Sequence, residues 1–103
     1  MKYKEFLEYL EKNLEGYNIF THKAMQYQRD KNLKRQPKSR WSDEKMQKAV
    51  YGMWKTAMEP LYNTLKGEIK SDFREPWYLF IEKNNLFESV NEGISELDFN
   101  EVA

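Results

Sequence analysis

The sequence has no cysteine and only one histidine among its 103 residues. Without cysteine there is no disulfide, no thiolate zinc site and no cysteine nucleophile. His22 alone cannot form a multi-histidine metal site, and the G-x-S-x-G motif that would support a serine triad is missing. The sequence also lacks a P-loop, a G-x-G-x-x-G fingerprint and an EF-hand loop. These absences predict a non-enzymatic protein with no cofactor and no metal.

Long hydrophobic runs are also missing. No stretch approaches the roughly 18 consecutive apolar residues that a membrane-spanning helix needs. The opening MKYKEFLEYLEKNLE places glutamates where a signal peptide has its apolar segment. Both observations favour a soluble, cytoplasmic protein without a membrane partner.

Glycine and proline total only seven, which favours long regular elements over a chain of many turns. The length suits a single domain, residues 1–103. Six Phe, seven Tyr and three Trp supply the apolar area that so charged a chain needs to fill a core. We therefore expect one helical domain with an aromatic core.

Helical periodicity begins near the N-terminus. Residues 2–15 carry an apolar face that includes Phe6 and Leu10, opposite a face rich in glutamate. Gly16 is predicted to end this helix in the left-handed conformation. Residues 18–34 hold no helix breaker and predict a second helix that is basic on its outer side.

The clearest helix start is the sequence WSDEKM. Ser42 is the expected N-cap, and Trp41 and Met46 occupy the two positions of a hydrophobic staple. The apolar stripe then continues over 43–70 but rotates near Pro60, where a proline inside a helix is costly. We predict one long central helix over 43–70 kinked near Pro60, with two abutting helices as the alternative.

Two shorter helices are expected after this one. The first starts at Ser71 or Asp72 and ends near Asn84, and the second extends to Gly93. Residues 94–103 are predicted to be either a last docked turn or a loosely ordered acidic tail. The result is a compact all-α bundle of four to five helices around the central one. Its predicted core consists of Phe6, Leu7, Leu10, Leu14, Val50, Met53, Trp54, Leu61, Leu65, Trp77, Phe80 and Ile81.

The net charge is zero, but residues 23–40 hold seven Lys and Arg against one acid. Cations and an aromatic ring at this density are candidates for contact with phosphates and unpaired bases. The candidate nucleic-acid-binding residues are Lys31, Lys34, Arg35, Lys38, Arg40 and Trp41.

The alternative interpretation is a solvated connector that the tryptophan fixes to the next helix. The connector over 35–41 is longer than the turn of a helix-turn-helix motif. Asp43 and Glu44 also stand where that motif reads bases, and they would repel phosphate. Binding of RNA or DNA through 23–40 is therefore the second predicted function.

The first predicted function is that of a small interaction or accessory protein that acts through a protein partner or by self-association. Tyrosine and methionine are typical of protein interfaces. Four apolar side chains lie on the flank of the central helix away from Met46 and Met53, and they are the candidate interface: Tyr51, Met58, Tyr62 and Ile69. The alternative is that neighbouring helices cover both flanks and make these side chains core.

The run RQPKSRWSDEKMQKAVYGMWKTAMEPLYNTLKGEIKSD (35–72), with the opening YKEFLEYLEKNL, resembles a group of small uncharacterised proteins from gut Firmicutes. Proteins of this group often accompany mobile elements. The similarity spans nearly the whole chain, but it carries no activity and no functional residues with it. The resemblance implies a bacterial, intracellular accessory protein.

Overall fold

The computed structural model describes residues 1–99 and shows an all-α protein with five α-helices in that range. They are α1 (Tyr3–Asn13), α2 (Gly16–Leu33), α3 (Asp43–Ile69), α4 (Arg74–Lys83) and α5 (Leu86–Ser95). A short 3-10 turn, η1 (Pro37–Ser39), lies between α2 and α3. The predicted all-α fold with a long central helix is confirmed.

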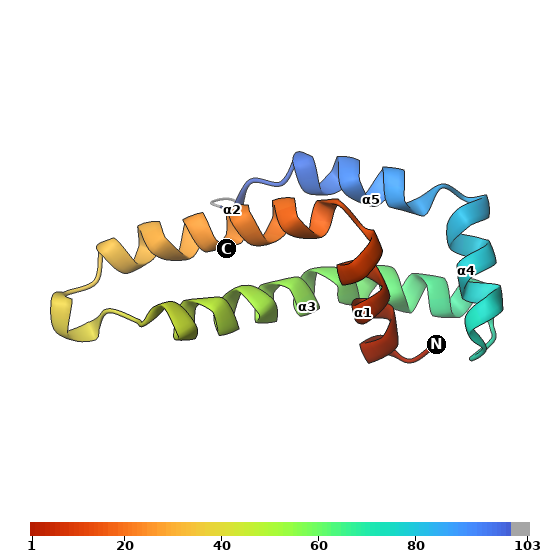
Figure 1. The fold of residues 1–103 in the computed structure, drawn as a ribbon, viewed down its shortest axis with the longest axis horizontal. Coiled ribbons are helices and arrows are strands. Elements are labelled where there is room, and N and C mark those ends of the chain that lie inside the picture. The colour runs from red at the N-terminus through yellow and green to blue at the C-terminus, as the bar shows by residue number, and fades with distance from the viewer. Residues whose placement is uncertain (100–103) are drawn as a thin grey trace.

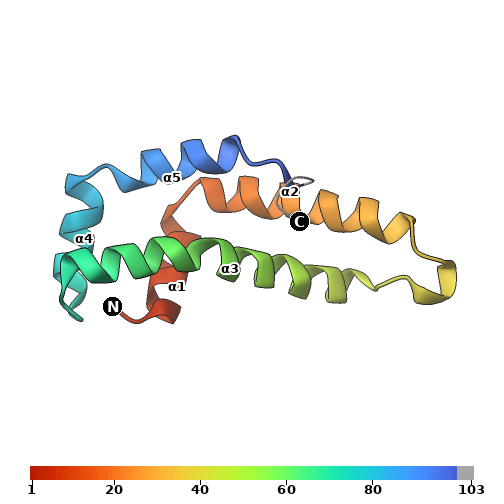
Figure 2. The same cartoon turned by 180° about the vertical axis from the view of Figure 1, so that it is seen from behind.

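The molecule is elongated, with extents of 50 × 24 × 21 Å, because α2 and α3 form a long antiparallel hairpin (Figure 1). The connector with η1 closes the tip of this hairpin. At the other end α1 crosses one face of α3 steeply, and α4 turns the chain back so that α5 runs along α2. The view from behind shows the same order, with α2 between α3 and α5 (Figure 2).

Helix α3 begins as the sequence predicts. The Ser42 Oγ accepts a hydrogen bond from the Lys45 N–H at 3.2 Å, so Ser42 is the N-cap. The helix continues without interruption through Pro60, and the alternative of two abutting helices is wrong. The kink at Pro60 stays a prediction. Lys70 ends the helix with a left-handed φ of 54°.

The predicted role of Gly16 is wrong. Helix α1 ends at Asn13, and Gly16 starts α2 without a left-handed φ. Its backbone N–H donates to the Oδ1 of Asn91 on α5 at 2.6 Å. A Cβ at this position would lie 2.9 Å from the Cδ1 of Ile94. Gly16 is therefore the point where α2 approaches α5 so closely that a Cβ would displace side chains of α5.

Two aromatic clusters fill the core. Phe6, Tyr62 and Trp77 form one, with ring centroids 5.2 to 5.9 Å apart. Phe20 and Trp54 form the centre of the other, with ring centroids 5.2 Å apart. Most of the predicted core is buried, and the exceptions are half-buried at its edge: Met53, Leu61 and Phe80. Sequence reasoning missed several buried residues of α2, α5 and the segment after α5: Phe20, Ala24, Ile94 and Phe99.

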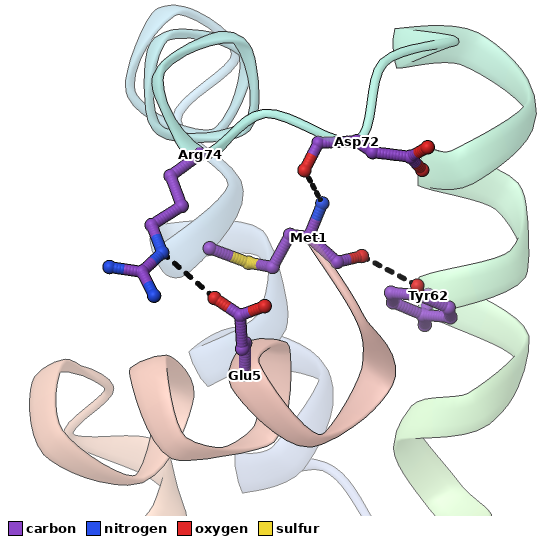
Figure 3. Close-up of polar contacts among 5 residues, drawn as sticks. All are labelled: Met1, Glu5, Tyr62, Asp72 and Arg74. Carbon is purple, nitrogen blue, oxygen red and sulfur yellow. Dashed lines mark hydrogen bonds and ion pairs between the residues drawn. The ribbon is translucent and has the colours of Figure 1, made fainter.

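The start of the chain is fixed at the junction of α1, α3 and α4 (Figure 3). Met1 is buried there, its amino group donates to the Asp72 carbonyl, and its carbonyl accepts from the Tyr62 hydroxyl at 2.6 Å. Arg74 donates from Nε to the Glu5 carboxylate at 2.8 Å. This hydrogen bond holds the pKa of Glu5 below its ordinary value.

Two side chains of the segment 94–99 pack against the core. Ile94 belongs to α5, and the buried Phe99 packs its ring edge-on against Phe20 at 5.1 Å between centroids. The Nζ of Lys23 donates to the Ser95 carbonyl at 2.8 Å. Ile94 and Phe99 are thus held against the core, and the choice between a docked and a loose segment over 94–103 stays a prediction. Residues 100–103 lie outside the described part of the chain.

Candidate functional site

The predicted cations gather at the free end of the α2–α3 hairpin, at the orange-to-yellow end of the ribbon in Figure 1. We call residues 29–48 the basic tip. They carry eight Lys and Arg against three Asp and Glu, a net charge of +5. No side chain between Gln28 and Met46 is buried, so the basic tip extends beyond the core.

Asn32 holds the connector of the basic tip to the end of α2. Its Oδ1 accepts from the Trp41 backbone N–H at 2.8 Å, and its Nδ2 donates to the Trp41 carbonyl at 3.1 Å. The same Oδ1 also accepts from an Arg35 Nη1 at 3.0 Å. The sequence analysis missed Asn32 because its bonds to the Trp41 backbone connect α2 with the end of the connector, and no local pattern predicts them.

The Trp41 side chain already has partners within the fold. The guanidinium carbon of Arg35 lies 4.1 Å from its ring centroid, and the Nζ of Lys45 lies 4.6 Å away. Cations over an indole face are attracted by its quadrupole. Two cations of the protein itself therefore lie over the Trp41 ring, and contact of this ring with a base stays a prediction. Its staple contact with the buried Met46 stays a prediction.

Among the described residues, the cations at the end of the basic tip have no carboxylate within ion-pair distance. Within residues 1–99 the ion pairs are Lys48–Glu44 at 3.6 Å and Arg74–Glu5 at 2.8 Å. Three exposed cations form no ion pair in that range: Lys34, Lys38 and Arg40. Arg40 donates instead to the Arg35 backbone carbonyl at 3.3 Å. Their charge is available to an anionic partner.

The predicted interface on α3 is corrected for two of its members. Met58 and Tyr62 are both buried in the core. The rings of Phe6 on α1 and Trp77 on α4 cover Tyr62. Ile69 is half-buried against that core. Tyr51 stays 38% exposed and donates to the Glu11 carboxylate at 3.2 Å. Partial burial, with the Glu11 charge beside it, raises the pKa of Tyr51.

A different apolar surface lies on the outer side of α4. Phe73 is 75% exposed and Leu79 66% exposed, and the half-buried Pro76 and Phe80 share this side of the helix. We call this surface the α4 face: Phe73, Pro76, Leu79 and Phe80. The sequence pattern predicts Phe80 as a core residue. Helical spacing shows which side chains share a face, but it does not show whether another helix covers that face.

Residues 1–99 contain no group of three or more His, Asp or Glu side chains placed to hold a metal ion. In the same range, no helix combines the length and the apolar composition that crossing a bilayer requires. His22 is exposed on α2. No protein-family model matches the sequence, and neither a curated protein nor a solved structure is significantly similar to it. Function must therefore be inferred from the side chains, and the resemblance to the Firmicutes group stays an expectation.

Proposed function

We propose that this chain is a non-enzymatic interaction protein that binds the phosphate backbone of nucleic acid through its basic tip. The observation that supports this is the projection of a +5 surface beyond the core, with Lys34, Lys38 and Arg40 unpaired among residues 1–99. Cations that neutralise phosphates release bound counterions, which drives association. Nothing in the core has to rearrange for this contact.

The contact is expected to be independent of nucleotide sequence. Trp41 is engaged by Arg35 and Lys45, and so we do not expect it to stack on a base. Asp43 and Glu44 occupy the first turn of α3, where they repel phosphate and keep that end away from a groove. Phosphate contacts alone position a protein without reading bases.

The test is fluorescence anisotropy of labelled single- and double-stranded DNA and RNA at about 50 and 200 mM salt. Three phosphate contacts, one for each of these cations, predict a loss of affinity of roughly 40-fold between these two conditions. Binding should be lost in a triple variant with Lys34→Ala, Lys38→Ala and Arg40→Ala.

The matched control removes the same charge from exposed lysines elsewhere, with Lys4→Ala, Lys66→Ala and Lys83→Ala. This control should retain most of the affinity. An equal loss in both variants would show that only net charge matters, and no binding at the lower salt would reject the proposal.

Self-association through the α4 face is the second candidate. The exposed Phe73 and Leu79 favour an apolar contact. An antiparallel pair of α4 helices from two copies would also bring Glu75 of one copy to Lys83 of the other, which have opposite charges. A second copy of this chain is therefore the proposed occupant.

Light scattering across a concentration series tests this candidate. Leu79→Glu should make the protein monomeric. Leu33→Glu is the control, because Leu33 is 68% exposed at the basic tip, away from the α4 face. A protein that is monomeric at every concentration would reject the α4 contact without affecting the nucleic-acid proposal.

A further inference from the structure

A groove of about 640 Å³ lies between α2 and α3, beside the docked residues 97–99. Its walls are largely aromatic and apolar, with Phe20 and Tyr27 from α2, Met53 from α3, and Phe99. The volume falls within the roughly 300–1,000 Å³ typical of sites for small organic molecules. The groove is therefore large enough for a drug-sized ligand.

Small residues of α3 give the groove its depth. Ala49, Gly52 and Ala57 line it from α3. A Cβ built on Gly52 would meet no atom within 4 Å, so the space above this glycine is open. A side chain at this position would therefore start in open space at the wall of the groove.

Gln28 adds an unsatisfied polar group to the wall of the groove. Its side chain is only 6% exposed, and its Nε2 donates to the Met53 Sδ at 3.3 Å. Its Oε1 accepts no hydrogen bond from any residue in 1–99. A buried acceptor without a donor is costly, and most such groups in native proteins have partners. Oε1 itself has almost no accessible surface, so the Gln28 amide has to turn toward the groove before the N–H or O–H group of a bound molecule can provide the missing donor.

Lys31 gives the same groove a positive charge. It lies one turn after Gln28 on α2 and lines the groove, and its Nζ is 5.9 Å from the centroid of the Tyr27 ring. The backbone N–H groups inside a partner helix are already bonded within that helix, so only its side chains could supply a donor for Gln28. The combination of donor and anion favours a small molecule.

We propose that this groove binds a small amphipathic anion. The ligand has an aromatic or aliphatic body that packs on Phe20, Met53 and Phe99. It carries an N–H or O–H group for Gln28 Oε1 and a carboxylate or sulfonate for Lys31. This site is separate from the phosphate contacts of Lys34, Lys38 and Arg40, and its test does not depend on nucleic-acid binding.

The probe is the 2,6 isomer of anilinonaphthalene sulfonate, which has its N–H and its sulfonate at opposite ends of an aromatic body. It is titrated against the full chain by fluorescence, and calorimetry gives the stoichiometry, expected to be one to one. Gly52→Leu fills the groove and should weaken binding by at least about tenfold. Gly67→Leu is the control, because Gly67 is also on α3 with open space above it but lies outside the groove. It should leave binding unchanged.

Two further variants separate the two polar contacts. Lys31→Ala should weaken binding of the sulfonate but not of its neutral analogue N-phenyl-2-naphthylamine. Gln28→Leu should weaken binding of both, because both carry the N–H. The comparison of Gly52→Leu with Gly67→Leu keeps the test valid even if Gln28→Leu alters the fold.

Equal binding to Gly52→Leu and Gly67→Leu would overturn the proposal and place the probe on the α4 face or another apolar surface. Binding by several probe molecules per chain would overturn it too, as would probe release with rising protein concentration, which would show that a second copy occupies the groove.

Discussion

Gly16 and Gly67 differ in their surroundings although both lie in helices. A Cβ at Gly16 would lie 2.4 Å from Asn91 Oδ1, whereas one at Gly67 meets no atom within 4 Å. Gly16→Ala should therefore destabilise the fold by about 1–3 kcal/mol, since the Asn91 and Ile94 side chains would have to move from their packed positions. Gly67→Ala should instead stabilise it by about 0.5–1 kcal/mol through helix propensity. Urea denaturation of both variants measures the difference. Two changes of the same sign would show that α5 does not pack on Gly16.

Among single side chains, Trp54 is the one whose removal we expect to reduce the free energy of unfolding most. It is fully buried, and the rings of Tyr17 and Phe20 meet it edge-on at 4.9 and 5.2 Å between centroids. Trp54→Ala should reduce the free energy of unfolding by about 3–5 kcal/mol. Phe73→Ala, at an exposed position, should change it by less than about 0.5 kcal/mol. A change below about 1 kcal/mol at Trp54 would contradict its place in the core.

Helices α1 and α4 are joined by the ion pair of Glu5 with Arg74, and this pair gives a prediction about pH. The Arg74 hydrogen bond lowers the pKa of Glu5 in the folded state, so the unfolded chain binds this proton more readily. The pair therefore adds stability above the unfolded pKa, and this contribution is lost as pH falls through the lower folded pKa. Arg74→Gln should return the pKa of Glu5 toward its ordinary value and remove this contribution.

Carboxyl NMR titration of Glu5 measures the shift directly, and urea midpoints measured from about pH 3 to 6 measure its effect on stability. Arg29→Gln is the control, since Arg29 is exposed on α2 and makes no ion pair within residues 1–99. An unchanged Glu5 pKa in Arg74→Gln would show that the pair does not form in solution.

Local patterns predict the start of α3 and the apolar face of α1 correctly, because capping and periodicity depend on residues close in sequence. Local patterns give the wrong role for Gly16. A glycine can either end a helix in the left-handed conformation or allow two helices to approach closely. The choice depends on Asn91, which lies 75 positions away along the chain. The pattern of residues 18–34 likewise does not indicate that both α3 and α5 pack on α2.

The core and the positive charge of the basic tip lie in different parts of the molecule. The aromatic clusters lie toward the end formed by α1 and α4, and the basic tip has no buried side chain between Gln28 and Met46. The cations of the tip are contiguous in sequence, so a pattern could predict them as a group. The groove could not be predicted in this way, because α2, α3 and residues 97–99 build it together.

This separation predicts that the two ends of the hairpin differ in local stability. Backbone amides of residues 29–45 should exchange with solvent through local opening, because none of these side chains is buried. Those around the fully buried Trp54 should exchange only on global unfolding. Asn32→Ala removes the two hydrogen bonds to the Trp41 backbone and should cost the tip about 1–2 kcal/mol, or roughly 5–30-fold faster exchange.

Native-state hydrogen exchange by NMR measures both ends in one experiment. Because the core does not contact Asn32, the exchange at Trp54 and the global free energy of unfolding should stay nearly unchanged in Asn32→Ala. Equal acceleration throughout the chain would mean instead that the hairpin unfolds as one unit. The basic tip would then be held by the core, and a phosphate backbone would meet a rigid surface instead of an adaptable one.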